Sequence, residues 1–273
     1  MDYFKIFLGF FEIIKFDFEK FVIIFNSINP DITWIVFLIF CFTIVLIFFR
    51  IFGEVGLYIY TVVAIIAANI QVLKLVKFSF FLDPIALGTI LFASTFLCTD
   101  ILVEHYGIKE ARKNVLLGFS GFLLMTLFML FTLAFTPLDI LKYSEEYDWA
   151  VNTQDHLLEL FLPLPTFFAA SMISYLFSQY FDVWLFNLIS KLTNKKYLWL
   201  RNNLSTMTSS LIDSFIFSIL AWIIFNPEPL DFFTVFITFI LGTYILRIFI
   251  SLIDTPFVYL AKYFNKNKYN DDI

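Results

Sequence analysis

Several charged side chains lie inside long apolar stretches of this 273-residue chain. Asp213 is near the middle of one such stretch, 204–225, which is long enough to cross a bilayer as a helix. An ionisable group at membrane depth costs about 2.5–3.5 kcal/mol on insertion scales and usually faces a partner or a cavity. A chain that keeps such groups in several apolar segments is therefore expected to bind or move a polar molecule.

Two serines share a helical face with Asp213. Ser205, Ser209 and Asp213 recur at every fourth residue, a spacing that aligns side chains along one side of a helix. Small polar residues in such a row can simply hold two membrane helices together. A carboxylate is a costly choice for that purpose where a serine would suffice. We therefore interpret Asp213, with Ser209 beside it, as a binding group.

A pair of acids lies at the end of another apolar segment. Asp100 and Glu104 are four residues apart, so a helix places both on one face, about one turn apart. Like charges at that spacing repel each other, and we therefore expect a nearby cation. It could be Lys109, Arg112 or Arg201. The alternative is an ordinary helix end whose acids are in water.

Other polar side chains interrupt the apolar segments and join those above as candidate substrate-binding residues. They are Asn69, Lys74, Gln179, Asp182 and Asn202. Arg247 stays protonated in proteins and therefore needs an acceptor. We expect it either to pair with Asp100 or Asp254, or to extend to the inner membrane surface.

Composition excludes an ordinary soluble protein. Hydrophobic residues make up 60% of the chain and charged residues only 15%, against about 45–50% and about 25% in soluble domains. The net charge of −5 provides no basic surface for nucleic acid. Cys41 and Cys98 lie inside apolar segments, and no HExxH motif or metal-ligand spacing occurs. Neither a disulfide nor a metal cofactor is expected.

Uncharged length and helix breakers divide the chain into seven apolar spans, which predict an all-α, polytopic integral membrane protein. The spans are 32–49, 55–76, 84–103, 115–135, one within 160–189, 204–225 and 232–253. Pro84 is expected to open the third span. Residues 1–31 combine apolar side chains near helical spacing with charges, which predicts an amphipathic helix at the membrane surface. A single transmembrane domain would then cover 32–263, followed by a polar cytoplasmic tail, 264–273.

Basic residues in the connecting segments indicate the orientation of the spans. They follow the third span, precede the sixth and follow the seventh: Lys109, Arg112, Lys113, Lys191, Lys195, Lys196, Arg201, Lys262, Lys266 and Lys268. The segment after the fourth span is acidic overall, and 226–231 contains no Lys or Arg. This pattern predicts a cytoplasmic C-terminus. Seven spans would then place the N-terminus outside.

Five longer stretches carry distinctive motifs. They read GLYIYTVVAIIAANIQVLKLV (56–76), TFLCTDILVEHYGIKEARKNVLLGF (95–119), SQYFDVWLF (178–186), LWLRNNLSTMTSSLIDSFIF (198–217) and DTPFVYLAKY (254–263). In their order and spacing they resemble the queuosine precursor transporter family over roughly residues 50–263. The chain departs from that pattern at Thr166, where an arginine usually follows the proline, and at Ser210, which replaces a glutamine.

The resemblance implies a carrier in the plasma (inner) membrane of a prokaryote. Its bundle of six core helices would begin at Val55 and resemble the substrate-binding subunits of energy-coupling-factor vitamin importers, with the first span and residues 1–31 as additions. The implied cargo is a deazaguanine precursor of the tRNA base queuosine, in the cyano or the aminomethyl form. The partners would be this small molecule and membrane lipid.

A deazaguanine has a ring N–H and an exocyclic amine on one edge, and a carbonyl beside them. Asp213 is expected to accept hydrogen bonds from both N–H groups. The carbonyl would be bound by one of the donors Asn69, Lys74 and Asn202. The aminomethyl form adds a cation, which would favour a second acid such as Asp100 or Asp182.

The chain contains no GxxxxGK[ST] motif, so it is not expected to hydrolyse ATP itself. We expect a secondary carrier in which protonation of Asp213, Asp100 or Glu104 couples to movement. The alternatives are a substrate-binding subunit that docks on a separate ATPase module, and a carrier of another purine-like or vitamin cargo. A homo-oligomer is compatible with either.

Two other classes of function compete with a carrier. A membrane-embedded enzyme would need a nucleophile with a base, or a histidine cluster, and no histidine lies in any of the spans. We therefore do not expect an enzyme. A passive structural subunit would tolerate neutral residues in place of Asp213, Lys74 and Asp100.

Overall fold

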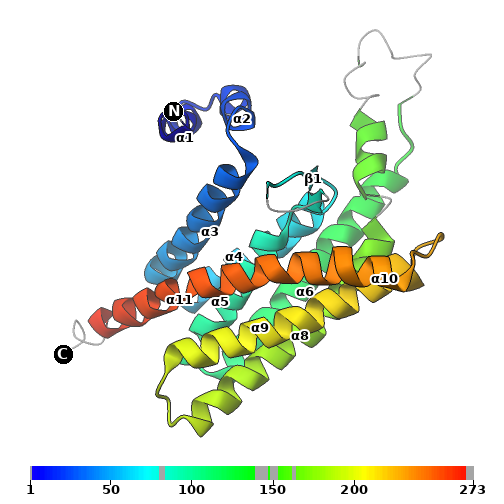
Figure 1. Ribbon diagram of the computed structural model, residues 1–273. Helices are drawn as coiled ribbons and strands as arrows, with labels where there is room; N and C mark the ends of the chain where they lie inside the picture. The colour runs from blue at the N-terminus through cyan, green and yellow to red at the C-terminus, as the bar shows by residue number, and fades with distance from the viewer. Residues whose placement is uncertain (1, 80–83, 139–146, 148–152, 162–163, 269–273) are drawn as a thin grey trace.

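The structure is a computed structural model that describes residues 2–79, 84–138, 147, 153–161 and 164–268. It is mostly helical, and its long helices lie side by side (Figure 1). The helices are α1 (Asp2–Ile14), α2 (Phe18–Asn26), α3 (Pro30–Phe52), α4 (Glu54–Gln71), α5 (Thr89–His105), α6 (Ile108–Ala134), α8 (Leu164–Leu192), α9 (Leu198–Ile219), α10 (Phe232–Thr234) and α11 (Gly242–Lys268). A further helical segment covers 153–161.

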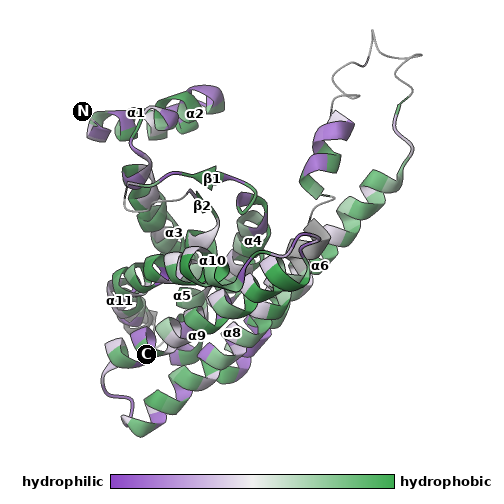
Figure 2. Cartoon of the chain, turned by 45° about the vertical axis from the view of Figure 1, so that its right-hand side comes forward, coloured by the Kyte–Doolittle hydropathy of each residue, from purple (hydrophilic) through white to green (hydrophobic). Residues whose placement is uncertain are grey.

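Two π-helical segments extend the last helices. The first, η1 (Leu220–Ile224), continues α9, and the second, η2 (Val235–Leu241), joins α10 to α11. Among the described residues, five helices are long and apolar enough to cross a membrane. They are Pro30–Phe52, Glu54–Gln71, Ile108–Ala134, Leu198–Ile224 and Phe232–Phe264. Hydrophobic residues dominate these helices (Figure 2). The mostly helical membrane fold is therefore confirmed, and the count of six core spans plus one stays a prediction.

The segment before α5 differs from the sequence prediction. Pro84 does not open a helix, because Ile85–Ala86 forms a strand, β2, antiparallel to β1 (Leu75–Val76). The helix α5 begins only at Thr89, after Gly88 with φ of 100°. A Cβ atom at Gly88 would lie 2.6 Å from the carbonyl oxygen of Ala68, so only glycine fits this close turn. The fold is therefore not purely α-helical.

Residues 1–31 were predicted to contain one amphipathic helix, and the structure has two. The first helix ends at Ile14, and Phe16 follows with a φ of 61°. Asp17 then caps α2 by accepting a hydrogen bond from the backbone N–H of Lys20. Apolar side chains such as Phe4 and Phe7 remain exposed on α1. Both helices lie at the end of α3 opposite the C-terminus (Figure 1).

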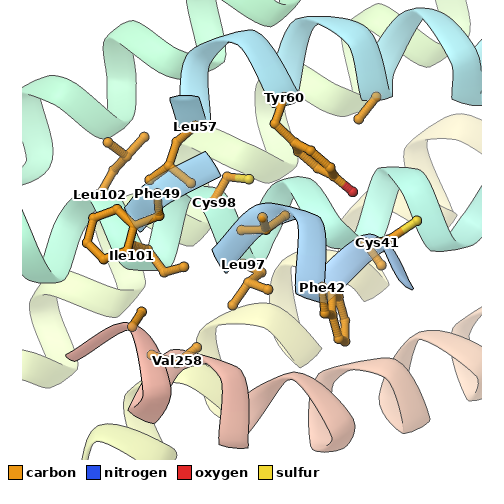
Figure 3. Close-up of a cluster of buried hydrophobic side chains, with 14 of the residues drawn as sticks. Cys41, Phe42, Phe49, Leu57, Tyr60, Leu97, Cys98, Ile101, Leu102 and Val258 are labelled. Carbon is orange, nitrogen blue, oxygen red and sulfur yellow. The ribbon is translucent and has the colours of Figure 1, made fainter. Parts of the chain in front are cut away.

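The apolar core surrounds α5. This helix contacts α3, α4, α6, α8 and α11, and its residues from Ile90 to Leu102 are almost all buried. Leu97, Cys98 and Ile101 of α5 lie among side chains of α3, α4 and α11 (Figure 3). The neighbouring side chains in that view include Phe42, Phe49, Leu57, Tyr60 and Val258. This packing makes α5 the central helix on which the polar side chains described below converge.

Gly56 allows α4 to approach α3 closely. A methyl group at this position would lie 2.3 Å from the carbonyl oxygen of Phe48, a backbone atom that cannot move aside cheaply. Gly56→Ala is therefore expected to destabilise the protein by about 1–3 kcal/mol. At Gly242 the nearest atom is 3.9 Å away, so Gly242→Ala should be close to neutral. Thermal unfolding of both variants in detergent checks this, and equal midpoints would contradict it.

Candidate functional site

Buried polar side chains face one another where α5, α8, α9 and α11 meet. On α9 they recur at helical spacing on one face, as the sequence predicts for Ser205, Ser209 and Asp213. We call the whole set the polar seam. Its members are joined in pairs by hydrogen bonds between side chains: Thr95, Thr99, Asp100, Glu104, Ser178, Gln179, Asp182, Arg201, Asn202, Asn203, Thr206, Ser209, Asp213, Ser214, Thr243, Arg247, Ser251, Asp254 and Thr255.

One end of the seam is held by Arg201, whose side chain is fully buried. Its guanidinium donates to Glu104 at 2.5 Å and to the backbone carbonyls of Lys195 and Lys196 at 3.0 and 3.3 Å. Lys262 approaches the same carboxylate at 3.5 Å. The predicted cation beside Glu104 is therefore Arg201, which ties the segment between α8 and α9 to α5.

One turn further along α5, Asp100 is fully buried and adjacent to Asp182 of α8. The hydroxyl of Ser209 donates to Asp182 Oδ1 at 2.9 Å, and the hydroxyl of Thr206 donates to Asp100 Oδ2 at 3.4 Å. In the part of the chain that the structure describes, Asp100 Oδ1 and Asp182 Oδ2 have no hydrogen-bond partner. Each carboxyl group thus keeps one oxygen that no donor among the described residues reaches, and the two groups lie within hydrogen-bonding reach of each other.

A third buried carboxyl group, Asp254 of α11, is close enough to Asp100 and Asp182 to interact with them electrostatically. Asn202 donates to Asp254 Oδ1 at 2.7 Å, whereas Asp254 Oδ2 and Asn202 Oδ1 have no partner among the described residues. We call Asp100, Asp182 and Asp254 the acid cluster. No group of three His, Cys, Asp or Glu within the described ranges is arranged to hold a metal ion.

Gln179 lies next to the acid cluster, one turn before Asp182 on α8. Its amide nitrogen donates to the hydroxyl of Thr95 at 2.8 Å, and its amide oxygen accepts from Thr99 at 3.3 Å. Both the nitrogen and the oxygen of the amide therefore form a hydrogen bond with a hydroxyl group of α5. Such hydroxyls can rotate and exchange partners, so the amide can re-pair with a ligand that offers a donor and an acceptor.

Asp213 lies about 16 Å along α9 from Asn202, towards the opposite end of the bundle. It forms an ion pair with Arg247 of α11 and accepts a hydrogen bond from Ser178 at 3.0 Å. Both charged side chains are only slightly exposed, 13% for Asp213 and 10% for Arg247. Asp213 is therefore a paired carboxylate at the far end of the seam.

The prediction that Arg247 pairs with Asp100 or Asp254, or extends to the membrane surface, is wrong. The helices α9 and α11 run antiparallel, with Asn202 opposite Asp254 and Asp213 opposite Arg247. Seven residues separate Arg247 from Asp254, which is about 10 Å along α11. The arginine is thus at the depth of Asp213 and too far from the acid cluster.

Two of the predicted residues lie away from the seam. Asn69 of α4 is buried and donates to the carbonyl oxygen of Ile65, in its own helix. Lys74 follows α4 in the exposed turn before β1. The structure therefore brings Asp100, Glu104, Gln179, Asp182, Asn202, Ser209 and Asp213 into one seam and leaves Asn69 and Lys74 outside it.

A groove between α9 and η2, with a volume of about 480 Å³, has a wholly apolar lining that includes Leu211, Phe215, Phe236 and Tyr244. Such a lining suits acyl chains better than a polar heterocycle. The polar seam is thus the better candidate for binding a polar molecule.

Comparisons with known proteins agree with a membrane carrier. Residues 86–261 match the family model described as "Putative vitamin uptake transporter". A protein of Bacillus subtilis (strain 168) named "Probable queuosine precursor transporter" is 36% identical over 230 residues, which is 84% of this chain and 93% of that protein. The chain belongs to the vitamin uptake transporter family. No solved structure has significant similarity to it.

The family match begins at β2 and ends in α11, so it contains the whole polar seam. A member of this family is a multi-pass transporter of the plasma membrane, and the transporter class argues against an enzyme.

Sequence reasoning named Asp254 only as a partner for Arg247. The signal that could have added it to the site is its position in DTPFVYLAKY, one of the stretches that carry the family resemblance.

Breaking the ion pair between Glu104 and Arg201 tests how strongly it stabilises the bundle. Glu104→Gln would leave the buried guanidinium of Arg201 without its counter-ion, a loss that typically costs about 3–5 kcal/mol. Glu19→Gln makes the same chemical change at an exposed position and should have little effect. Thermal unfolding in detergent compares the two. A midpoint for Glu104→Gln equal to that of Glu19→Gln would refute the structural role of the pair.

Proposed function

We propose that this protein imports a queuosine precursor, a deazaguanine, across the plasma membrane. The observation that carries the proposal is the 36% identity, over 84% of the chain, to a protein named as a queuosine precursor transporter. The family match, residues 86–261, contains every residue of the seam. The buried polar side chains of the seam suit a flat, polar cargo.

We propose that Asp182 binds the edge of the deazaguanine that carries the ring N–H and the amine. A carboxylate can accept both hydrogen bonds, and Asp182 Oδ2 has no partner among the described residues. Gln179, one turn away, can donate its amide N–H to the neighbouring carbonyl. Ser209 then holds the other carboxyl oxygen of Asp182 in place at 2.9 Å.

This assignment replaces Asp213 with Asp182 as the residue expected to bind the guanine-like edge of the cargo. The carboxylate of Asp213 is already engaged by Arg247 and Ser178, so it has less capacity to bind a further pair of donors. We propose instead that the Asp213 pair joins α9 to α11 and forms one end of the substrate passage. Asp100 is adjacent to Asp182 and would attract the cation of an aminomethyl cargo.

The seam is closed in this structure. Asp100, Asp182, Asn202 and Ser209 are all fully buried, so a heterocycle can reach them only if neighbouring helices separate. Transporters commonly expose a midplane site by moving one part of a bundle against another. We propose that α8 and α9, which pack closely together, move as a pair relative to α5.

The direct test is uptake of radiolabelled cyano- and aminomethyl-deazaguanine by cells that cannot make deazaguanine and that carry or lack this gene. We expect uptake only with the gene. Unlabelled guanine should compete and adenine should not, because guanine offers a carboxylate two adjacent N–H donors, whereas adenine offers one donor beside an acceptor. Uptake that is equal in both strains, or blocked equally by adenine, would contradict the proposal.

Asp182→Asn tests the binding role of Asp182. It keeps the size of the side chain but places a donor against the donors of the cargo. We expect uptake to fall about 10–100-fold, as the loss of hydrogen bonds to a charged group predicts. Glu228→Gln, at an exposed position before α10, is the matched control and should transport normally. Wild-type uptake by Asp182→Asn, at equal amounts of protein in the membrane, would rule out this assignment.

The energy source separates a secondary carrier from a subunit of an ATPase complex. We propose a secondary carrier, because the seam contains buried acids that suit proton coupling. In membrane vesicles without ATP, uptake should then continue and should stop when a protonophore is added. Uptake that needs ATP and resists the protonophore would favour a separate ATPase module.

A further inference from the structure

The acids of the polar seam fall into two groups according to their partners. Glu104 and Asp213 each form an ion pair with a buried or nearly buried arginine. Asp100, Asp182 and Asp254 have no ion-pair partner in the part of the chain that the structure describes, although all three are fully buried. A charge removed from water needs a counter-ion or a bound proton to offset the cost of burial. The acid cluster has no counter-ion of its own.

A second observation concerns hydrogen bonds. Each acid of the cluster keeps one oxygen without a partner among the described residues, and so does the amide of Asn202, whose Oδ1 is buried beside Asp254. An amide oxygen, unlike a carboxylate oxygen, does not take up a proton. It therefore needs a hydrogen-bond donor from another group. Native proteins rarely leave buried acceptors unmet, so these four neighbouring atoms are suited to a ligand that supplies hydrogen-bond donors.

A proton is the ligand that fits these atoms. Bound to a carboxyl group, it converts an acceptor into an O–H donor that can satisfy a neighbouring oxygen. The described residues contain no arrangement of three acids that could hold a metal ion. We propose that Asp100, Asp182 and Asp254 form a proton-binding site that couples import of the cargo to the proton gradient. The proposal rests on the import function proposed above and adds the site of coupling.

Other charged groups near the cluster are already engaged or lie at its edge. On α5, α8, α9 and α11, the described acidic, basic and histidine side chains outside the cluster are Glu104, His105, Lys191, Arg201, Asp213, Arg247 and Lys262. Arg201 and Lys262 bind Glu104, and Arg247 binds Asp213. On α3, Arg50 lies over the ring of Phe264 at 5.2 Å.

The proton and the cargo share the cluster through Asp182. To accept the two N–H groups of a deazaguanine, Asp182 must be ionised, and its neighbours Asp100 and Asp254 are adjacent to take up a proton. One proton therefore enters from outside with each cargo molecule and passes between Asp100 and Asp254, both of which are needed, while the cargo is bound. When the cargo leaves towards the cytoplasm, the same proton leaves with it. No bond other than O–H is made or broken.

The test uses the purified full-length protein in liposomes that contain a pH-sensitive dye. The cyano-deazaguanine, which carries no aminomethyl cation, is added outside the liposomes. The dye then reports the protons that enter, and the radiolabel reports the cargo that enters. For the wild type we expect about one proton per cargo molecule. Asp254→Asn places an N–H where the protonated acid has its O–H, so it should fold while fixing the site in its protonated form. Protons moved per cargo molecule should then fall at least about tenfold.

Asp254→Glu keeps a carboxyl group and should restore the ratio, whereas a merely structural role of Asp254 would not distinguish Glu from Asn in this way. If Asp254→Asn does not fold well enough to be purified, Asp100→Asn repeats the test. Glu228→Gln, at an exposed position, is the control, and its ratio of protons to cargo molecules should be unchanged. Cargo movement without proton movement in the wild type would overturn the coupling site alone. Absence of exchange between labelled and unlabelled cargo in the same liposomes would overturn the import function, and the coupling site with it.

Discussion

The antiparallel contact between α9 and α11 aligns the polar groups that these two helices contribute to the seam. Hydrocarbon offers no hydrogen bonds, so polar side chains at membrane depth must find partners on neighbouring helices. Asn202 opposite Asp254 and Asp213 opposite Arg247 fix the register of these two helices at two points. A shift of either helix by one residue would separate both pairs and leave charged groups unpaired.

Much of the fold could be predicted from the sequence because it depends on local properties. Apolar length located the long helices, and helical spacing placed Ser205, Ser209 and Asp213 on one buried face of α9. The short hairpin before α5 could not be predicted in this way. It depends on the close approach of Gly88 to the end of α4, a contact between segments that periodicity does not report. The break at Phe16 has the same kind of cause, since a single residue with positive φ decides it.

The candidate site could be predicted in part. The sequence identified Asp100, Gln179, Asp182, Asn202 and Ser209 one by one, because each is a polar residue in an apolar segment. It paired them only in part: Arg201, 97 residues from Glu104, was one of three cations expected beside that acid, whereas the partner of Arg247, 34 residues away, was not predicted. Such pairs depend on how helices pack, so residue type and spacing along the chain cannot decide them. Lys74 was included for the same reason, since its exposed turn becomes visible only once α4 ends at Gln71.

The contrast between paired and unpaired acids has an electrical consequence. Asp213 and Arg247 form a neutral dipole, so the voltage across a membrane exerts little net force on them. The acid cluster contains no arginine or lysine among the described residues, and its net charge therefore changes with every proton it gains or loses. A charge that crosses the whole membrane gains or loses about 2.3 kcal/mol per 100 mV. Voltage would act on this protein mainly at Asp100, Asp182 and Asp254, where three helices meet.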